Sequence, residues 1–225
     1  MTLIPMANKE DTLNLIQELT SRYGEAATEK LVSYVDKVLE RNEHINLTAV
    51  RDRDEAMQKH LADSLAAAEL PEFLSAERII DIGTGAGFPG ALLAIAFPEK
   101  TFVLMDSTLK RLKVIDEFAA DLGISNLMTI HGRAEELARK EEFKESFDVC
   151  VSRAVASLDK LSGWCLPYVK SGGYFIPYKG ENYQTELKDA QKQLKKYKGS
   201  FIRAVNISGE SSDISGHVLM VIRKK

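Results

Sequence analysis

The sequence has little cysteine: its 225 residues include two, and they do not form a Cys-x-x-Cys pair. Cys150 and Cys165 lie in apolar segments, which predicts two buried free thiols and excludes a disulfide framework or a zinc site built on cysteine. The sequence also lacks an apolar run of the roughly 20 residues that a membrane-spanning helix needs. No basic segment followed by an apolar one opens the chain. These absences predict a cytoplasmic protein without a membrane anchor.

A strong positive charge is absent as well, since the formal net charge is −3. That value would be unusual for a nucleic-acid-binding protein, but the charge is uneven. Residues 1–80 carry more acids than bases, whereas residues 81–225 carry a small excess of Lys and Arg. Any phosphate-binding surface is therefore local, and the candidates are residues 188–198 and Arg223-Lys224-Lys225. A solvated helix face and a solvated chain end explain these two segments equally well.

The apolar periodicity divides the chain into two parts. Over residues 8–70 apolar side chains recur at helical spacing, interrupted at Gly24 and at Asn46-Leu-Thr48. From residue 79 onward short apolar strands alternate with helices, which is typical of a doubly wound α/β fold with a largely parallel sheet. We therefore predict an N-terminal helical extension over residues 1–75, packed on a main α/β domain over residues 76–225.

The second part predicts seven strands and five helices between them. The strands are expected near residues 79–82, 101–105, 127–131, 147–151, 173–177, 201–207 and 217–222, and the helices near 90–97, 108–122, 133–140, 157–168 and 182–198. A non-helical stretch, residues 208–215, joins the last two strands, so these form an antiparallel pair rather than a parallel crossover. A mostly parallel seven-stranded sheet that ends in such a pair indicates the Rossmann-like class I methyltransferase fold.

A glycine-rich turn follows the first strand, in the sequence Ile79-Ile-Asp-Ile-Gly-Thr-Gly-Ala-Gly-Phe-Pro-Gly90. Such a turn lets a ligand approach the backbone closely. Its second half fits the Gly-x-Gly-x-x-Gly pattern of dinucleotide sites, so an NAD-dependent oxidoreductase is one alternative. An acid at the strand end instead suits a cationic amino-acid group, and a bulky Phe-Pro leaves less room for a diphosphate. The loop thus favours S-adenosyl-L-methionine, with Asp81, Gly83, Gly85 and Phe88 as candidate contacts.

The next two strands end in residues suited to an adenosine. Asp106 closes the second strand, where a carboxylate can hold both ribose hydroxyls. It could equally cap the helix that starts near Thr108, and the two roles are compatible. After the third strand, backbone groups near Ala134 and Glu135 could contact the adenine edge, although an acid there also suits the first turn of a helix.

The fourth strand ends in Arg153 instead of a group that could remove a proton. The segment has no Asn/Asp-Pro-Pro-Tyr tetrad and no Pro-Cys nucleophile. Because arginine stays protonated, it favours an acceptor that is nucleophilic without losing a proton, such as N7 of guanine. A salt bridge from Arg153 to Asp148 or to a nearby acid is the structural alternative.

The fifth strand is expected to bring Lys179 and two tyrosines, Tyr174 and Tyr178, to the same crevice. Cations and aromatic rings of this kind hold unpaired RNA bases. Either tyrosine could equally be part of the core.

Several of these motifs together resemble one family, the glucose-inhibited division protein B family. The resemblance covers roughly residues 40–225 and rests on Asn46-Leu-Thr48, His60-Leu-Ala-Asp-Ser-Leu65, Asp81–Gly90, Asp106-Ser107, Arg133-Ala-Glu135, Ser152-Arg-Ala154 and Lys179-Gly180. It implies methyl transfer from S-adenosyl-L-methionine to N7 of one guanine in 16S ribosomal RNA of the small subunit. Thr84 and Asp106 stand where many relatives have Ser and Glu, and both changes preserve the chemistry.

The resemblance also implies roles for particular residues. Cofactor contacts are implied at Gly83, Phe88, Asp106, Ser107, Thr108, Ala134, Glu135 and Arg153, and RNA contacts at Arg133, Arg153 and Lys179. Arg153 and Lys179 are the expected catalytic pair, in a monomer without a metal. His60 and Asp63, on one face of a predicted helix, are expected to link the helical extension to the glycine loop, since two ligands are too few for a metal.

Two other functions remain open at this point. One is a methyltransferase for a small cytosolic molecule, with the helical extension as a lid. The other is a ribosome assembly factor that binds S-adenosyl-L-methionine without catalysis.

Overall fold

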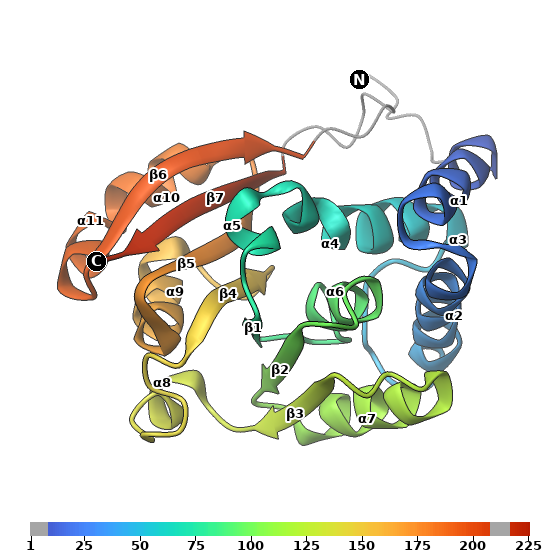
Figure 1. Cartoon of the computed structure of the whole chain (residues 1–225), viewed down its shortest axis with the longest axis horizontal. Helices are drawn as coiled ribbons and strands as arrows, with labels where there is room; N and C mark the ends of the chain where they lie inside the picture. Colours follow the sequence, from blue (N-terminus) through green and yellow to red (C-terminus); the bar gives the residue numbers. More distant parts are fainter. Residues whose placement is uncertain (1–8, 208–216) are drawn as a thin grey trace.

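A seven-stranded sheet forms the centre of the computed structural model, which describes residues 9–207 and 217–225 (Figure 1). The strands are β1 (Arg78–Ile82), β2 (Thr101–Asp106), β3 (Leu127–His131), β4 (Phe147–Arg153), β5 (Val169–Lys179), β6 (Gly199–Asn206) and β7 (Val218–Lys224). Their order is β3-β2-β1-β4-β5-β7-β6. Strands β1 to β5 are parallel, and β7 pairs antiparallel with both β5 and β6. The predicted fold class and its C-terminal antiparallel pair are confirmed.

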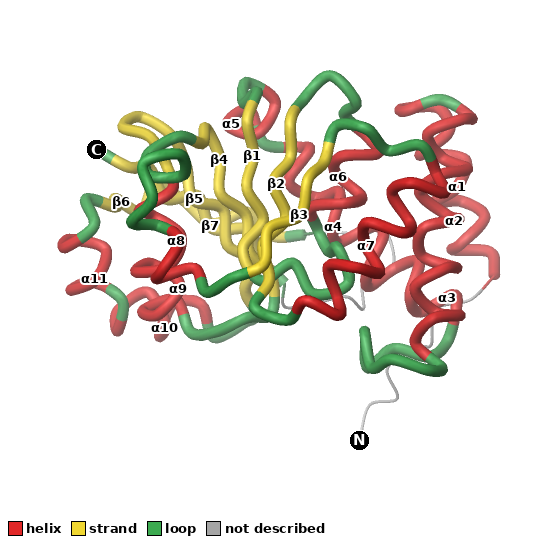
Figure 2. Tube along the Cα trace, turned by 90° about the horizontal axis from the view of Figure 1, so that it is seen from below, coloured by secondary structure: helices red, strands yellow, loops and turns green. Residues whose placement is uncertain are grey.

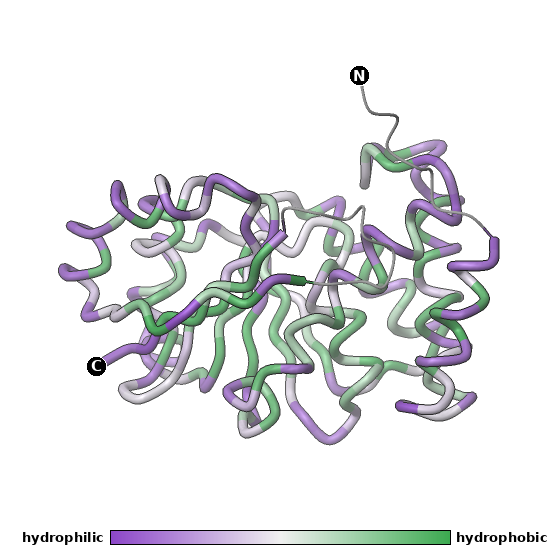
Figure 3. The backbone as a smooth tube through the Cα atoms, turned by 90° about the horizontal axis from the view of Figure 1, so that it is seen from above, coloured by the Kyte–Doolittle hydropathy of each residue, from purple (hydrophilic) through white to green (hydrophobic). Residues whose placement is uncertain are grey.

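Helices cover both faces of this sheet (Figure 2). The first face carries α1 (Lys9–Tyr23), α2 (Glu25–Asn42), α3 (Arg53–Ala56), α4 (Asp63–Leu65), α5 (Pro71–Leu74), α6 (Gly90–Ala96) and α7 (Leu109–Leu122). The second carries α8 (Ala134–Leu137), α9 (Leu158–Cys165), α10 (Tyr183–Asp189) and α11 (Gln191–Lys196). Each face buries its own apolar cluster, and the strands between them are largely hydrophobic in Figure 3. Cys150 and Cys165 are both free and fully buried in the second cluster, as predicted.

The N-terminal helices share a core with the sheet. Tyr34 of α2 and Phe73 of α5 are fully buried in the same cluster as Leu92 of α6 and Phe102 of β2. Gly24, with φ of 83°, separates α1 from α2 as the periodicity predicted. The division into residues 1–75 and 76–225 stays a prediction.

Three predicted elements differ from the observed ones. The helix expected over 182–198 is two helices, α10 and α11, that meet at Ala190. The helix expected over 133–140 is a single turn, Ala134–Leu137. Residues Met57–Ala62, which contain His60, form a π-helical segment between α3 and α4. The connection expected over 208–215 lies outside the described residues.

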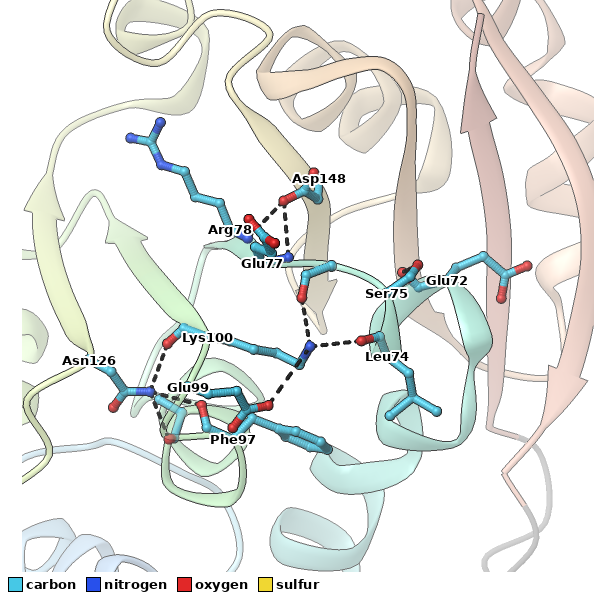
Figure 4. Close-up of polar contacts among 12 residues, drawn as sticks. Glu72, Leu74, Ser75, Glu77, Arg78, Phe97, Glu99, Lys100, Asn126 and Asp148 are labelled. Atoms are coloured by element: carbon cyan, nitrogen blue, oxygen red, sulfur yellow. Dashed lines mark hydrogen bonds and ion pairs between the residues drawn. The ribbon is translucent and has the colours of Figure 1, made fainter.

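A buried lysine fixes the junction between the helical segment and β1 (Figure 4). Lys100 Nζ donates to the carbonyl oxygens of Leu74 at 2.8 Å and Ala76 at 2.6 Å, and the residue is 8% exposed. Beside it, Asn126 Nδ2 lies within 3.0–3.1 Å of three carbonyl oxygens, one of them that of Lys100. These contacts hold the end of α5 against the amino ends of β1 and β2. They therefore set where the first strand begins.

Replacing Lys100 with methionine should destabilise the protein. The change keeps most of the apolar side chain but leaves two carbonyl oxygens without their donor, at a cost of about 2–3 kcal/mol in the free energy of unfolding. Urea unfolding measures this loss in the free energy of unfolding. Lys113→Met, at an exposed position on α7, is the matched control and should cost less than about 0.5 kcal/mol. Equal unfolding midpoints for the two variants would show that Lys100 does not stabilise the junction.

Candidate cofactor and substrate site

A cavity of about 610 Å³ opens where the carboxyl ends of β1, β2, β3 and β4 meet. This is the edge at which doubly wound sheets bind ligands. The predicted site residues that line it are Gly83, Gly85, Phe88, Asp106, Ser107, Arg133, Ala134, Glu135 and Arg153. Asp81, Thr108 and Lys179 are not among the lining residues. The structure thus brings most of the predicted residues together.

The glycine loop is held by backbone hydrogen bonds and by α2. Gly83 and Thr84 donate their N–H groups to the Met105 carbonyl at 2.8 and 3.0 Å. Tyr34 donates its hydroxyl to the Ala86 carbonyl at 2.9 Å. Gly85 has φ of 60°, and a Cβ added there would meet nothing within 4 Å. The loop therefore presents an open backbone surface at Gly85, while its far side is packed tightly.

Gly87 marks the tightly packed side. It has φ of 93°, and an added Cβ would lie 2.2 Å from the Tyr34 hydroxyl oxygen. Gly87→Ala should therefore lower the free energy of unfolding by about 3 kcal/mol, because backbone strain and a buried clash add. Gly24→Ala is the matched control: its φ is 83°, but nothing lies within 4 Å of the added Cβ. It should cost about 1 kcal/mol. Thermal unfolding of both variants checks the difference, and equal losses would argue against the clash.

Asp81 lies behind the glycine loop and is fully buried. Its Oδ2 accepts hydrogen bonds from Thr84 Oγ1 at 2.7 Å and from the Gly90 N–H at 2.9 Å. Its Oδ1 is a buried oxygen without a hydrogen-bond partner among the described residues. Burial raises the pKa of this carboxyl to about 6. Asp81 therefore ties the loop to the following helix and keeps one acceptor unused.

Asp106 links the loop to the start of α7. Its Oδ2 accepts from the Gly85 N–H at 3.0 Å, and its Oδ1 accepts from the Thr108 N–H at 2.8 Å. Arg111 lies 3.8 Å from the same carboxylate. Because Thr108 is itself the N-cap residue of α7, this contact is a two-residue turn and the N-cap role considered for Asp106 is wrong. The ribose-binding role stays a prediction.

Arg153 meets the helical segment at the cavity wall. It donates to the Lys59 carbonyl at 3.0 Å, its second terminal nitrogen lies 3.4 Å from His60 Nδ1, and its guanidinium lies 5.5 Å from the Phe88 ring centre. Desolvation lowers the pKa of Arg153, which remains a cation. The alternative salt bridge to Asp148 or a nearby acid is wrong. Asp148 pairs with Lys170 and with the backbone N–H groups of Glu77 and Arg78, and no acid that the structure describes forms a salt bridge with Arg153.

His60 joins the helical segment to the glycine loop. Its ring stacks on Phe88 with centres 4.7 Å apart, and its Nε2 lies 2.6 Å from Thr48 Oγ1. Burial, followed by the charge of Arg153, lowers the pKa of His60 to about 4, so the ring is neutral at pH 7. Asp63 pairs instead with His217, at 2.9 Å, and raises the pKa of that histidine. Of the two residues predicted to connect the helical extension to the glycine loop, His60 makes that contact and Asp63 does not.

The residues predicted on β5 lie outside the cavity. Lys179 is 8% exposed, with its Nζ 2.6 Å from Glu186 and 2.8 Å from the Ala156 carbonyl. Tyr178 is buried and donates its hydroxyl to the Ser64 carbonyl at 2.8 Å, so it belongs to the core. In this structure the Lys179 ammonium is therefore neutralised and directed at protein groups.

The cavity is also lined by residues that the sequence analysis did not single out, among them Met105, Arg111, Val155 and Trp164. Trp164 comes from α9, and its being the single tryptophan was the available signal. The Asn46-Leu-Thr48 motif is also explained here. Asn42 Oδ1 accepts from the Leu47 and Thr48 N–H groups at 2.7 and 3.1 Å, which holds that segment at the cavity wall.

Comparison with solved structures places this sheet among Rossmann-like methyltransferases. A ribosomal protein L11 methylase from Lactobacillus delbrueckii subsp. bulgaricus superposes with a TM-score of 0.52 at 19% identity, covering 73% of this chain and 77% of the other. TrmN from Thermus thermophilus superposes with a TM-score of 0.54 at 21% identity, covering 73% of this chain and 48% of the other. The fold is thus that of a class I methyltransferase.

Relatives in sequence identify the family within this fold class. Residues 27–214 match the family model of the rRNA small subunit methyltransferase G. A protein named ribosomal RNA small subunit methyltransferase G from Clostridium novyi (strain NT) is 40% identical, covering 95% of this chain and 88% of that protein. One from Lachnoclostridium phytofermentans is 42% identical, covering 87% and 81%. This chain belongs to the rRNA small subunit methyltransferase G family.

The described residues lack two further features. No helix there has both the length and the apolar character to cross a membrane. No group of three or more His, Cys, Asp or Glu in the same residues is placed to hold a metal ion.

Proposed function

We propose that this chain transfers the methyl group of S-adenosyl-L-methionine to N7 of a guanine in 16S ribosomal RNA, in the cytoplasm. Relatives at about 40% identity over most of the chain, all named for methylation of small-subunit ribosomal RNA, support the reaction class. The observation that carries the choice of acceptor is Arg153, a fixed cation, at the end of β4.

The residues at the cavity fit the proposed cofactor. The open backbone at Gly85 gives room for close approach. Behind the loop, Asp81 does not line the cavity, but its buried Oδ1 has no hydrogen-bond partner among the described residues, and its charge would favour the ammonium of the cofactor's amino-acid part. Asp106 and Ser107 would serve the ribose, and Ala134 and Glu135 the adenine edge, all four lining the cavity. Bound there, the cofactor supplies an electrophilic methyl group on a sulfonium.

The polar groups around Arg153 are already engaged, which favours an acceptor that keeps its protons. His60 uses both ring nitrogens, toward Thr48 and Arg153, and both Asp106 oxygens accept backbone hydrogen bonds. N7 of guanine carries an in-plane lone pair and needs no deprotonation before attack. The protein's part is to align the base with the methyl group and to exclude water. Arg153 can orient a phosphate or the base edge while it does so.

Labelled methyl donor tests the reaction. The protein is incubated with the donor and with small ribosomal subunits from a strain that lacks the gene, and label is followed into RNA and protein. We expect label in 16S RNA. Label in ribosomal protein alone would overturn the proposal.

Two rival functions give different results in the same experiment. A methyltransferase for a small cytosolic molecule would bind the donor but leave the RNA unlabelled. A non-catalytic assembly factor would bind both partners and transfer nothing. Titration calorimetry with the donor and with NAD distinguishes a methyltransferase from an NAD-dependent oxidoreductase, since an oxidoreductase would bind NAD tightly.

A further inference from the structure

A basic surface lies at the end of the molecule opposite α1 and α2 in Figure 1, around α11, the start of β6 and the C-terminal residues. Residues 190–207 contain Lys192, Lys195, Lys196, Lys198 and Arg203 and no acid. The chain's last three residues add Arg223, Lys224 and Lys225. We call this group of side chains the α11 patch. It concentrates positive charge in a chain whose net charge is −3.

Most of the cations in the α11 patch face solvent without an acidic partner. Arg203 pairs with Glu72 and Lys224 with Glu145, so these two are neutralised. Lys192, Lys195, Lys196, Lys198, Arg223 and Lys225 are exposed. None of the six forms a salt bridge with another residue that the structure describes. They are therefore free to meet an anionic partner.

The surface of the α11 patch is hollowed. A depression of about 580 Å³ is lined by Gln191, Lys195, Lys198, Ser200, Phe201 and Lys225, among others. Lysines beside hydroxyl and amide groups suit phosphate oxygens. An aromatic ring between them suits a base or sugar. This combination is more typical of a nucleic-acid contact than of a solvated helix face.

The α11 patch is remote from the proposed methylation site. Arg153, which lines the cavity, pairs with Tyr178 of β5. Tyr178 pairs with Leu219, which also pairs with Val205 of β6. Gly199, beside the hollow, pairs with Lys224 at the other end of the β6–β7 hairpin. The six-residue span from Val205 back to Gly199 measures roughly 20 Å at strand spacing. A ligand that touches both sites must therefore be an extended polyanion.

We propose that the α11 patch binds the phosphate backbone of small-subunit ribosomal RNA at a position away from the guanine that receives the methyl group. The inference rests on the proposed function and extends it, because it makes recognition depend on RNA well beyond the target base. Phosphate contacts of this kind position a substrate without reading its sequence. They also make binding salt-dependent through counterion release.

The test compares Lys195→Gln/Lys198→Gln with Lys9→Gln/Lys113→Gln, a control variant that removes the same charge from two exposed positions on α1 and α7. Binding to deproteinised 16S RNA and to assembled small subunits is measured at several salt concentrations. The KM and kcat for methylation of the RNA are measured as well. The α11 variant should reduce the slope of log affinity against log salt by about two and raise the KM for RNA about tenfold. Its kcat and its affinity for the methyl donor should match the wild type. All values for the control variant should match the wild type as well.

The outcomes separate the two proposals. If the wild type methylates no RNA, the proposed function fails. If the wild type methylates RNA and the α11 variant keeps its salt slope and KM, the proposed function stands and the α11 patch is not an RNA contact. If the α11 variant binds naked RNA normally but loses affinity for assembled small subunits, the patch contacts a ribosomal protein, which also overturns the inference.

Discussion

Replacing Arg153 with methionine is expected to lower the rate of methyl transfer to ribosomal RNA at least about a hundredfold. The guanidinium is held by the Lys59 carbonyl and His60 beside the Phe88 ring, so its direction is fixed before substrate arrives. Methionine keeps most of the packing but removes the cation and its donors. Single-turnover methylation at saturating RNA and donor measures the effect.

Two further variants make the result specific. Arg153→Lys should recover little activity, because an ammonium cannot reproduce the two-point contact of a guanidinium. Arg139→Met, at an exposed position after α8, removes the same charge and should keep the wild-type rate. Full activity in Arg153→Met, with the protein folded, would refute the assignment of Arg153 to the reacting site.

Asp81→Asn is expected to weaken binding of S-adenosyl-L-methionine by about ten- to a hundredfold. The buried Oδ1 is unused, whereas Oδ2 holds Thr84 and Gly90. The amide is similar in shape, so the loop should stay folded, but it cannot offer a negative charge to the cofactor's ammonium. Titration calorimetry measures the affinity. An unchanged dissociation constant would mean that Asp81 acts only on the loop.

The pH dependence gives a second measure of the same contact. Burial raises the pKa of Asp81 to about 6 in the protein without cofactor. The carboxyl is therefore protonated below pH 6 and must lose its proton before it can attract a cation. Affinity for the cofactor should rise from pH 5 to pH 7 in the wild type and change much less in Asp81→Asn. Parallel pH profiles for the two proteins would contradict this role.

The sheet could be predicted from the sequence because its signals are local. Strand ends such as Asp81, Asp106 and Arg153 are each preceded by a short apolar run, and the carboxyl ends of parallel strands must meet at one edge. The glycine spacing likewise placed Gly83 and Gly85 at the ligand-binding turn. All of these except Asp81 line the cavity.

What the sequence could not predict depends on contacts between distant segments. Lys179 was expected in the crevice, yet Glu186 and the Ala156 carbonyl hold its ammonium elsewhere. The π-helical turn of Met57–Ala62 sets where the His60 ring points, and no local pattern announces such a turn. Trp164 lines the cavity from α9, which covers the second face of the sheet. Its position depends on how α9 packs, which no local sequence pattern indicates.

Identification of the methylated atom tests the central claim most directly. Small subunits from a strain lacking the gene are incubated with the protein and labelled S-adenosyl-L-methionine, and the 16S RNA is digested to nucleosides for mass analysis. We predict one labelled product, 7-methylguanosine, from a single position. Label on an exocyclic amino group, on a ribose or on a pyrimidine would contradict the account, since those acceptors must lose a proton or be activated by a nucleophile.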